Sequence, residues 1–180
     1  MWMLAAVLSV HAGQLLAGEY HKPISKLKIR ADDLDGRWTG PTGLVINDVN
    51  DLSKLSEESK AVAETIAEKM KSIHVEGCGD FTYRDPNSPF KQVTIRIYSF
   101  KGEQECLDFW AKKYKTDDAA KLYKQPEGLD YMALDSLEMK KRAIQIGNIW
   151  ITAHQLHEGQ DHITILDKFI EKLLKTKGMK

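Results

Sequence analysis

The most constraining stretch of the chain is residues 141–174, KRAIQIGNIWITAHQLHEGQDHITILDKFIEKLL, which predicts a tight hairpin followed by an amphipathic helix. Two β-favouring runs, 143–146 and 149–152, flank Gly147 and Asn148, a pair able to adopt positive φ, and this arrangement is typical of a hairpin. Asp161 is placed to cap a helix whose apolar residues recur at steps of three and four. A hairpin and a one-faced helix cannot cover each other completely, so the stretch predicts a layered sheet-and-helix fold.

The remainder of the chain supplies further elements of the same kinds. Strands are expected at 44–46, 92–99 and 131–134, and helices from Asp48 or Asp51 to Lys71 and over 102–114. We also expect a loose leader at 19–25, an edge strand at 27–30, and a strand broken into 73–75 and 80–84 by two glycines. Together these elements predict a single globular α+β domain over residues 19–180, a mostly antiparallel sheet of five to seven strands packed with about three helices.

The first eighteen residues are typical of a secretory signal peptide cleaved near Gly18. They contain no Lys, Arg, Asp or Glu, and their apolar run is too short and too broken to span a bilayer. The positive residue that normally precedes the apolar run is missing, and the alternative is a buried amino-terminal helix. Position 19 is Glu, so no cysteine is present there to carry a lipid. We therefore expect a soluble exported protein, periplasmic or extracellular, without a stable membrane anchor after cleavage.

The balance of positive and negative residues argues against a nucleic-acid partner. The 180 residues contain 26 Lys+Arg and 26 Asp+Glu, a net charge of zero. A dedicated nucleic-acid binder needs surplus positive charge, so no nucleic-acid partner is expected. Two lysine-rich spots, at 112–115 and 140–142, are interpreted as solvated faces, each able to hold one anionic partner.

The two cysteines, Cys78 and Cys106, leave two interpretations open. In an exported chain they could form a disulfide, which would stabilise the fold by about 3–4 kcal/mol on a chain-entropy model. They could equally be two unrelated thiols, because sequence spacing does not give the geometry of a disulfide.

The densest group of chemically versatile side chains lies between residues 154 and 162. His154, His157 and His162, with Glu158 and Asp161, offer the imidazole and carboxylate groups that bind zinc or copper. The spacing argues against a metal site, since His157 and His162 are five residues apart and a metal-binding helix needs four. The competing interpretation is a solvated loop that joins a strand to a helix.

Three functions are compatible with these observations. The first is an exported, non-enzymatic binding or accessory module for an unknown protein or small ligand, with no catalytic residue and no cofactor. The second is a zinc- or copper-binding protein that uses His154, His157 and His162. The third is an enzyme whose site is assembled from distant residues such as His74, Cys78, Asp80 and the region around His157; no P-loop, nucleophile elbow or C-x-x-C motif supports it.

Overall fold

The computed structural model describes residues 20–35, 37–114, 121–123, 131–136 and 141–177. The strands are β1 (Thr39–Thr42), β2 (Val45–Ile46), β3 (Val75–Asp85), β4 (Ser88–Phe100), β5 (Lys121–Tyr123), β6 (Tyr131–Ser136), β7 (Lys141–Ile146) and β8 (Ile149–Gln155). The helices are α1 (Glu57–Lys71), α2 (Glu103–Tyr114) and α3 (Asp161–Lys177), preceded by two short 3-10 turns, η1 (Ile24–Leu27) and η2 (Ala31–Asp33).

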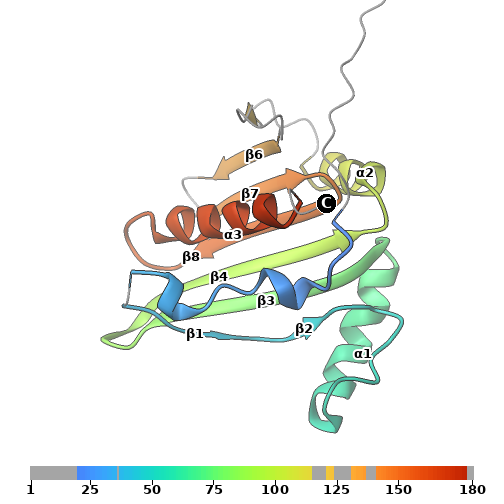
Figure 1. Cartoon of the computed structure of the whole chain (residues 1–180), viewed down its shortest axis with the longest axis horizontal. Coiled ribbons are helices and arrows are strands. Elements are labelled where there is room, and N and C mark those ends of the chain that lie inside the picture. The colour runs from blue at the N-terminus through green and yellow to red at the C-terminus, as the bar shows by residue number, and fades with distance from the viewer. Residues whose placement is uncertain (1–19, 36, 115–120, 124–130, 137–140, 178–180) are drawn as a thin grey trace, which may run out of the picture.

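One antiparallel sheet organises the molecule (Figure 1). Its strand order is β1-β3-β4-β8-β7-β6-β5, and β2 lies on the same side of β3 as β1, so the eight strands of the described residues occupy seven positions. Every pairing is antiparallel. The predicted α+β architecture, a mostly antiparallel sheet with three helices, is therefore confirmed.

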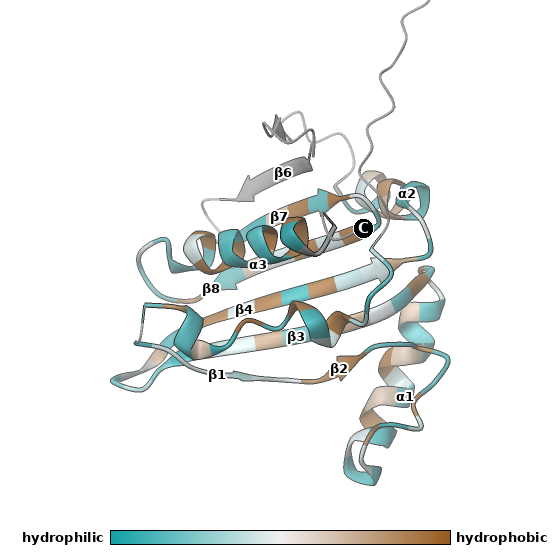
Figure 2. Ribbon diagram, in the orientation of Figure 1, coloured by the Kyte–Doolittle hydropathy of each residue, from teal (hydrophilic) through white to brown (hydrophobic). Residues whose placement is uncertain are grey.

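The hairpin and helix of residues 141–174 form the centre of the core, as predicted. Strands β7 and β8 meet at Gly147, whose φ is 54°, and α3 lies across the sheet with its apolar side inward (Figure 2). Its buried residues pack on the odd-numbered residues of β3 and β4 and on β7 and β8, and they include Ile165, Leu166, Phe169, Ile170 and Leu173. We call this covered side of the sheet the α3 face.

The expected loose leader and edge strand at residues 19–30 are wrong. Tyr20, Ile24 and Leu27 are buried in the core of the α3 face, and the segment forms η1 instead of a strand. The Tyr20 backbone N–H donates to Asn148 Oδ1 at 2.6 Å, and Asn148 Nδ2 donates to the Tyr20 carbonyl at 3.1 Å. The Asn148 side chain, in the tight turn between β7 and β8, thus holds the backbone at Tyr20 against the sheet.

The expected break in β3 is also wrong, because one strand runs from Val75 to Asp85, with a register shift between Val75 and Gly77 but no break at the glycines. Its two glycines allow close packing instead of ending the strand. A Cβ at Gly77 would lie 2.7 Å from the Asn47 carbonyl oxygen, and a Cβ at Gly79 would lie 3.0 Å from the Ile24 side chain. Glycine therefore lets η1 and the chain around residue 47 approach the strand closely.

Helix α1 begins later than expected, at Glu57. Asp48 and Asp51 close turns before it, since Asp48 Oδ1 accepts the Asn50 backbone N–H at 2.8 Å and Asp51 Oδ1 accepts that of Ser53 at 3.1 Å. Such local bonds compete with helix formation. No helix among the described residues is long and apolar enough to cross a membrane. The predicted signal peptide, residues 1–18, lies outside the described residues.

Candidate functional site

The second face of the sheet is covered at one end by α1 and α2, while its middle carries polar side chains. Cross-strand pairing places these side chains in two rows, because directly paired residues point to the same side of a sheet. One row joins Asp80, Arg96 and Thr152, and the other joins Thr82, Thr94, His154 and Lys141. We call this side the polar face.

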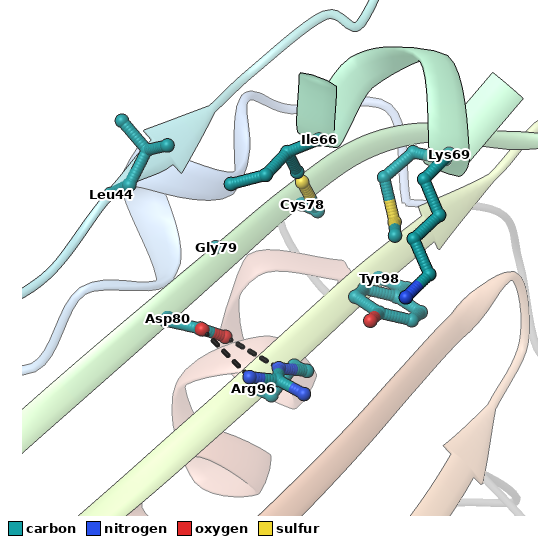
Figure 3. A pocket seen from close by; sticks show the side chains of 9 residues that line it. Leu44, Ile66, Lys69, Cys78, Gly79, Asp80, Arg96 and Tyr98 are labelled. Carbon is teal, nitrogen blue, oxygen red and sulfur yellow. Dashed lines mark hydrogen bonds and ion pairs between the residues drawn. The ribbon is translucent and has the colours of Figure 1, made fainter. Parts of the chain in front are cut away.

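A hollow of about 190 Å³ lies on the polar face where α1 meets β3 and β4. Figure 3 shows Ile66 and Lys69 of α1 over the strand residues that form its floor. The described lining residues are Leu44, Ile66, Lys69, Met70, Cys78, Gly79, Asp80, Arg96 and Tyr98. The hollow therefore has an apolar wall and a charged wall.

The charged wall is built on a two-point ion pair. Arg96 Nε and Nη2 donate to Asp80 Oδ1 and Oδ2 at 2.8 and 2.9 Å (Figure 3). These hydrogen bonds raise the pKa of Arg96, so the guanidinium stays charged. Two of the five guanidinium N–H groups go to Asp80, and Tyr98 also hydrogen-bonds the guanidinium, which leaves the remaining N–H groups for a ligand. Such forked donors suit carboxylate and phosphate groups.

Two further lysines extend the positive charge across the polar face. Lys113 Nζ lies 5.4 Å from the Phe109 ring centroid and 5.3 Å from that of Trp150, a cation–π arrangement. Burial lowers the pKa of Lys113, and the charges of Lys141, Arg96 and Lys69 lower it further. No described carboxylate lies within ion-pair distance of the Lys69, Lys113 or Lys141 ammonium group. We call Lys69, Arg96, Lys113 and Lys141 the cationic cluster.

The polar face also holds His154, one of the three predicted metal ligands. Burial lowers the pKa of His154, and the neighbouring Lys141 ammonium lowers it further. His154 is thus neutral at pH 7 and adds no charge to the cationic cluster at that pH.

The structure does not bring the three histidines together. His154 lies on the polar face, whereas His162 Nδ1 contacts Gln155 Oε1 at 2.9 Å, and Gln155 points to the opposite side of the sheet. His157 Nε2 lies 2.8 Å from Asp161 Oδ2 in the loop before α3. No group of three or more His, Cys, Asp or Glu side chains in the described part of the chain is arranged to hold a metal ion.

Asp161 takes a different role from the predicted one. Its carboxylate contacts Arg37 at 3.0 Å, Lys91 at 3.5 Å and His157 at 2.8 Å. The first turn of α3 is capped from β8, where Gln155 Oε1 accepts the His162 backbone N–H at 2.8 Å. These contacts of Asp161 connect the start of α3 to Lys91 on β4 and to Arg37, which precedes β1.

The candidates for an assembled catalytic site are separated as well. Among His74, Cys78, His154, His157, Glu158 and His162, Cys78 alone lines the hollow. His74 lines a second hollow of about 200 Å³ beside α1 and α2, together with Lys71, Glu76, Lys101 and Glu105. Burial raises the pKa of the Cys78 thiol to about 11, Asp80 adding to the rise and Arg96 opposing it. Cys78 and Cys106 are both buried, free thiols.

No sequence pattern marked Lys69, Arg96 or Tyr98 as a site residue. Lys113 and Lys141 belonged to the two lysine-rich spots, and the fold places these two lysines on the same side of the sheet. Arg142 of the second spot pairs with Ala153 and points to the α3 face instead. Apolar and polar residues alternate over 92–99, and this pattern places Arg96 on the polar side of the predicted strand. Nothing in the sequence indicates that Asp80 pairs with Arg96 across the β3–β4 hairpin.

Comparison with known proteins assigns the chain to no family, since no family model and no curated protein matches it.

Proposed function

We propose that the protein is an exported, soluble, non-enzymatic binding module that holds a negatively charged ligand on its polar face. The observation that carries the proposal is the cationic cluster beside the hollow. Four positive side chains gather there, and the one acidic residue among the described lining residues, Asp80, is already paired with Arg96. Bringing like charges together is unfavourable, and an anion bound between them removes that repulsion.

The chemistry of the hollow supports binding over turnover. Its thiol, Cys78, is protonated at neutral pH because its pKa is raised to about 11, and a thiol is a weak nucleophile compared with a thiolate. No histidine stands among the described lining residues to act as its base. A binding role needs only the positive charge and the shape that the residues already provide.

The proposal is tested by NMR titration of the protein with acetate, inorganic phosphate and hexanoate at low salt. We expect shifts of the Arg96 and Tyr98 amides, and an affinity that falls about two- to five-fold in Lys69→Ala, the range for one partly exposed charge. Lys71→Ala is the matched control, because Lys71 lies on the same helix but lines the second hollow. Absence of binding by all three anions, or turnover abolished by a single change in the hollow, would contradict the proposal.

A further inference from the structure

We infer that the ligand of the hollow is a small amphiphilic acid: one anionic group attached to a short acyl chain or a single ring. The inference rests on the proposed function and specifies its ligand class. It is drawn from the volume of the hollow and from the division of its lining into apolar and charged walls.

The volume limits the size of the ligand. The hollow measures about 190 Å³, close to the ~150 Å³ of an apolar cavity that takes up one benzene molecule. Sites for drug-sized molecules occupy roughly 300–1,000 Å³. One ring or a short acyl chain fits this space, whereas a nucleotide or an oligosaccharide does not.

The apolar wall of the hollow favours a ligand that has an apolar portion. Leu44, Ile66 and Met70 are among the residues that line the hollow. Figure 3 shows Leu44 and Ile66 apart from the Asp80–Arg96 pair, and the ring of Tyr98 on the floor. Leu44 and Ile66 are only partly buried by the protein itself. Covering them would remove apolar surface from water, which is favourable by about 25 cal/mol per Å². A purely polar anion such as phosphate would leave this surface exposed.

The charged wall places the acid group. Lys69 and Arg96 line the same hollow as Ile66 and Leu44, so a carboxylate can meet the cations while its chain lies against the apolar residues. Asp80 keeps Arg96 in position through two hydrogen bonds. This arrangement discriminates against a neutral amide of the same shape, which would leave the cationic cluster uncompensated.

The experiment compares acetate, butyrate, hexanoate and hexanamide on the wild-type protein by calorimetric or NMR titration. We expect affinity to rise at least ten-fold from acetate to hexanoate, and to fall at least five-fold from hexanoate to hexanamide. Ile66→Ala should weaken hexanoate about five-fold and leave acetate unchanged. Val62→Ala is the matched control, because Val62 lies on the same helix and is 58% exposed.

The outcomes separate the two proposals. Equal affinity for acetate and hexanoate, weakened in Lys69→Ala, would overturn the amphiphilic ligand class and leave the proposed anion-binding function standing. Absence of binding by every acid would overturn both. The chain-length series is measured on the wild-type protein, so it decides the inference even if Ile66→Ala fails to fold.

Discussion

Asp161 shows how a single side chain connects distant parts of this chain. Burial tends to raise the pKa of Asp161, but the hydrogen bond from His157 and the charges of Lys91 and Arg37 together hold it below its ordinary value. A carboxyl group whose pKa is lowered by folding stabilises the native state above the ordinary value of about 3.9, and this contribution is lost as the pH falls through the folded-state pKa.

We therefore predict that Asp161→Asn lowers the free energy of unfolding by about 2 kcal/mol at pH 7, the usual scale for charged hydrogen bonds. The difference from the wild type should shrink as the pH falls towards 3, because protonation of Asp161 removes the same interactions. Urea denaturation at pH 7 and at pH 3 measures both differences. Asp108→Asn, on the exposed side of α2, is the control and should change stability little at either pH. If the difference in unfolding free energy between the wild type and Asp161→Asn were the same at pH 7 and pH 3, the charge of Asp161 would not be the cause of the stabilisation.

The sequence pointed to Asp161 for the wrong reason. An aspartate before an apolar run predicts a helix cap, but capping is provided by Gln155, which reaches the His162 backbone N–H from β8. Sequence position shows which residues precede a helix and not which strand lies beside its first turn. The same limit applies to Asn148, whose side chain bonds Tyr20 and Phe100 although sequence analysis assigns it only to a turn.

Strand β3 shows, for a whole element, that the sequence does not reveal which segments lie beside a residue in the fold. Gly77 and Gly79 predicted a broken strand, yet β3 continues through both glycines. Their role is to let neighbouring segments approach the strand closely. Helix α3, β4 and the β7–β8 hairpin were predictable because their apolar periodicity is strong and local. Segment η1 was not, because its burial depends on which part of the sheet lies under it.

We predict that Gly77→Ala lowers the free energy of unfolding by about 1–3 kcal/mol, the usual cost of forcing extra atoms into a packed site. The new Cβ would lie 2.7 Å from the Asn47 backbone oxygen, so the chain at residue 47 must move. The Asn47 side chain accepts the Ser25 backbone N–H at 2.9 Å, and that contact moves with it. Glu76→Ala, an exposed change in the same strand, is the control. Equal denaturation midpoints for the two variants would contradict this account of β3.

At the scale of the whole molecule, the cationic cluster arises from segments that are far apart in the sequence. Lys69 lies on α1, Arg96 on β4, Lys113 on α2 and Lys141 on β7. The sequence shows two lysine-rich spots and a net charge of zero. A net charge of zero for the whole chain does not reveal that positive side chains gather on one face. The topology places β4 next to β8 and β8 next to β7, and this order assembles the cluster. The fold class was predictable from local patterns, whereas the site depends on strand order.

The described core begins at Tyr20, the first residue that the structure describes. Tyr20, Ile24 and Leu27 are each less than 5% exposed, and burying a large apolar side chain contributes about 1.5–3 kcal/mol. A form that starts at Lys28 loses all three, or roughly 5–9 kcal/mol, which is comparable to the whole stability of an ordinary domain. We expect that form to be unfolded. A form that starts at Glu19 should be as stable as the full chain in urea denaturation, because an exported protein is expected to fold without its signal peptide. Greater stability of the full chain would support a buried amino-terminal helix, and amino-terminal sequencing of exported protein that did not begin near Glu19 would contradict cleavage at Gly18.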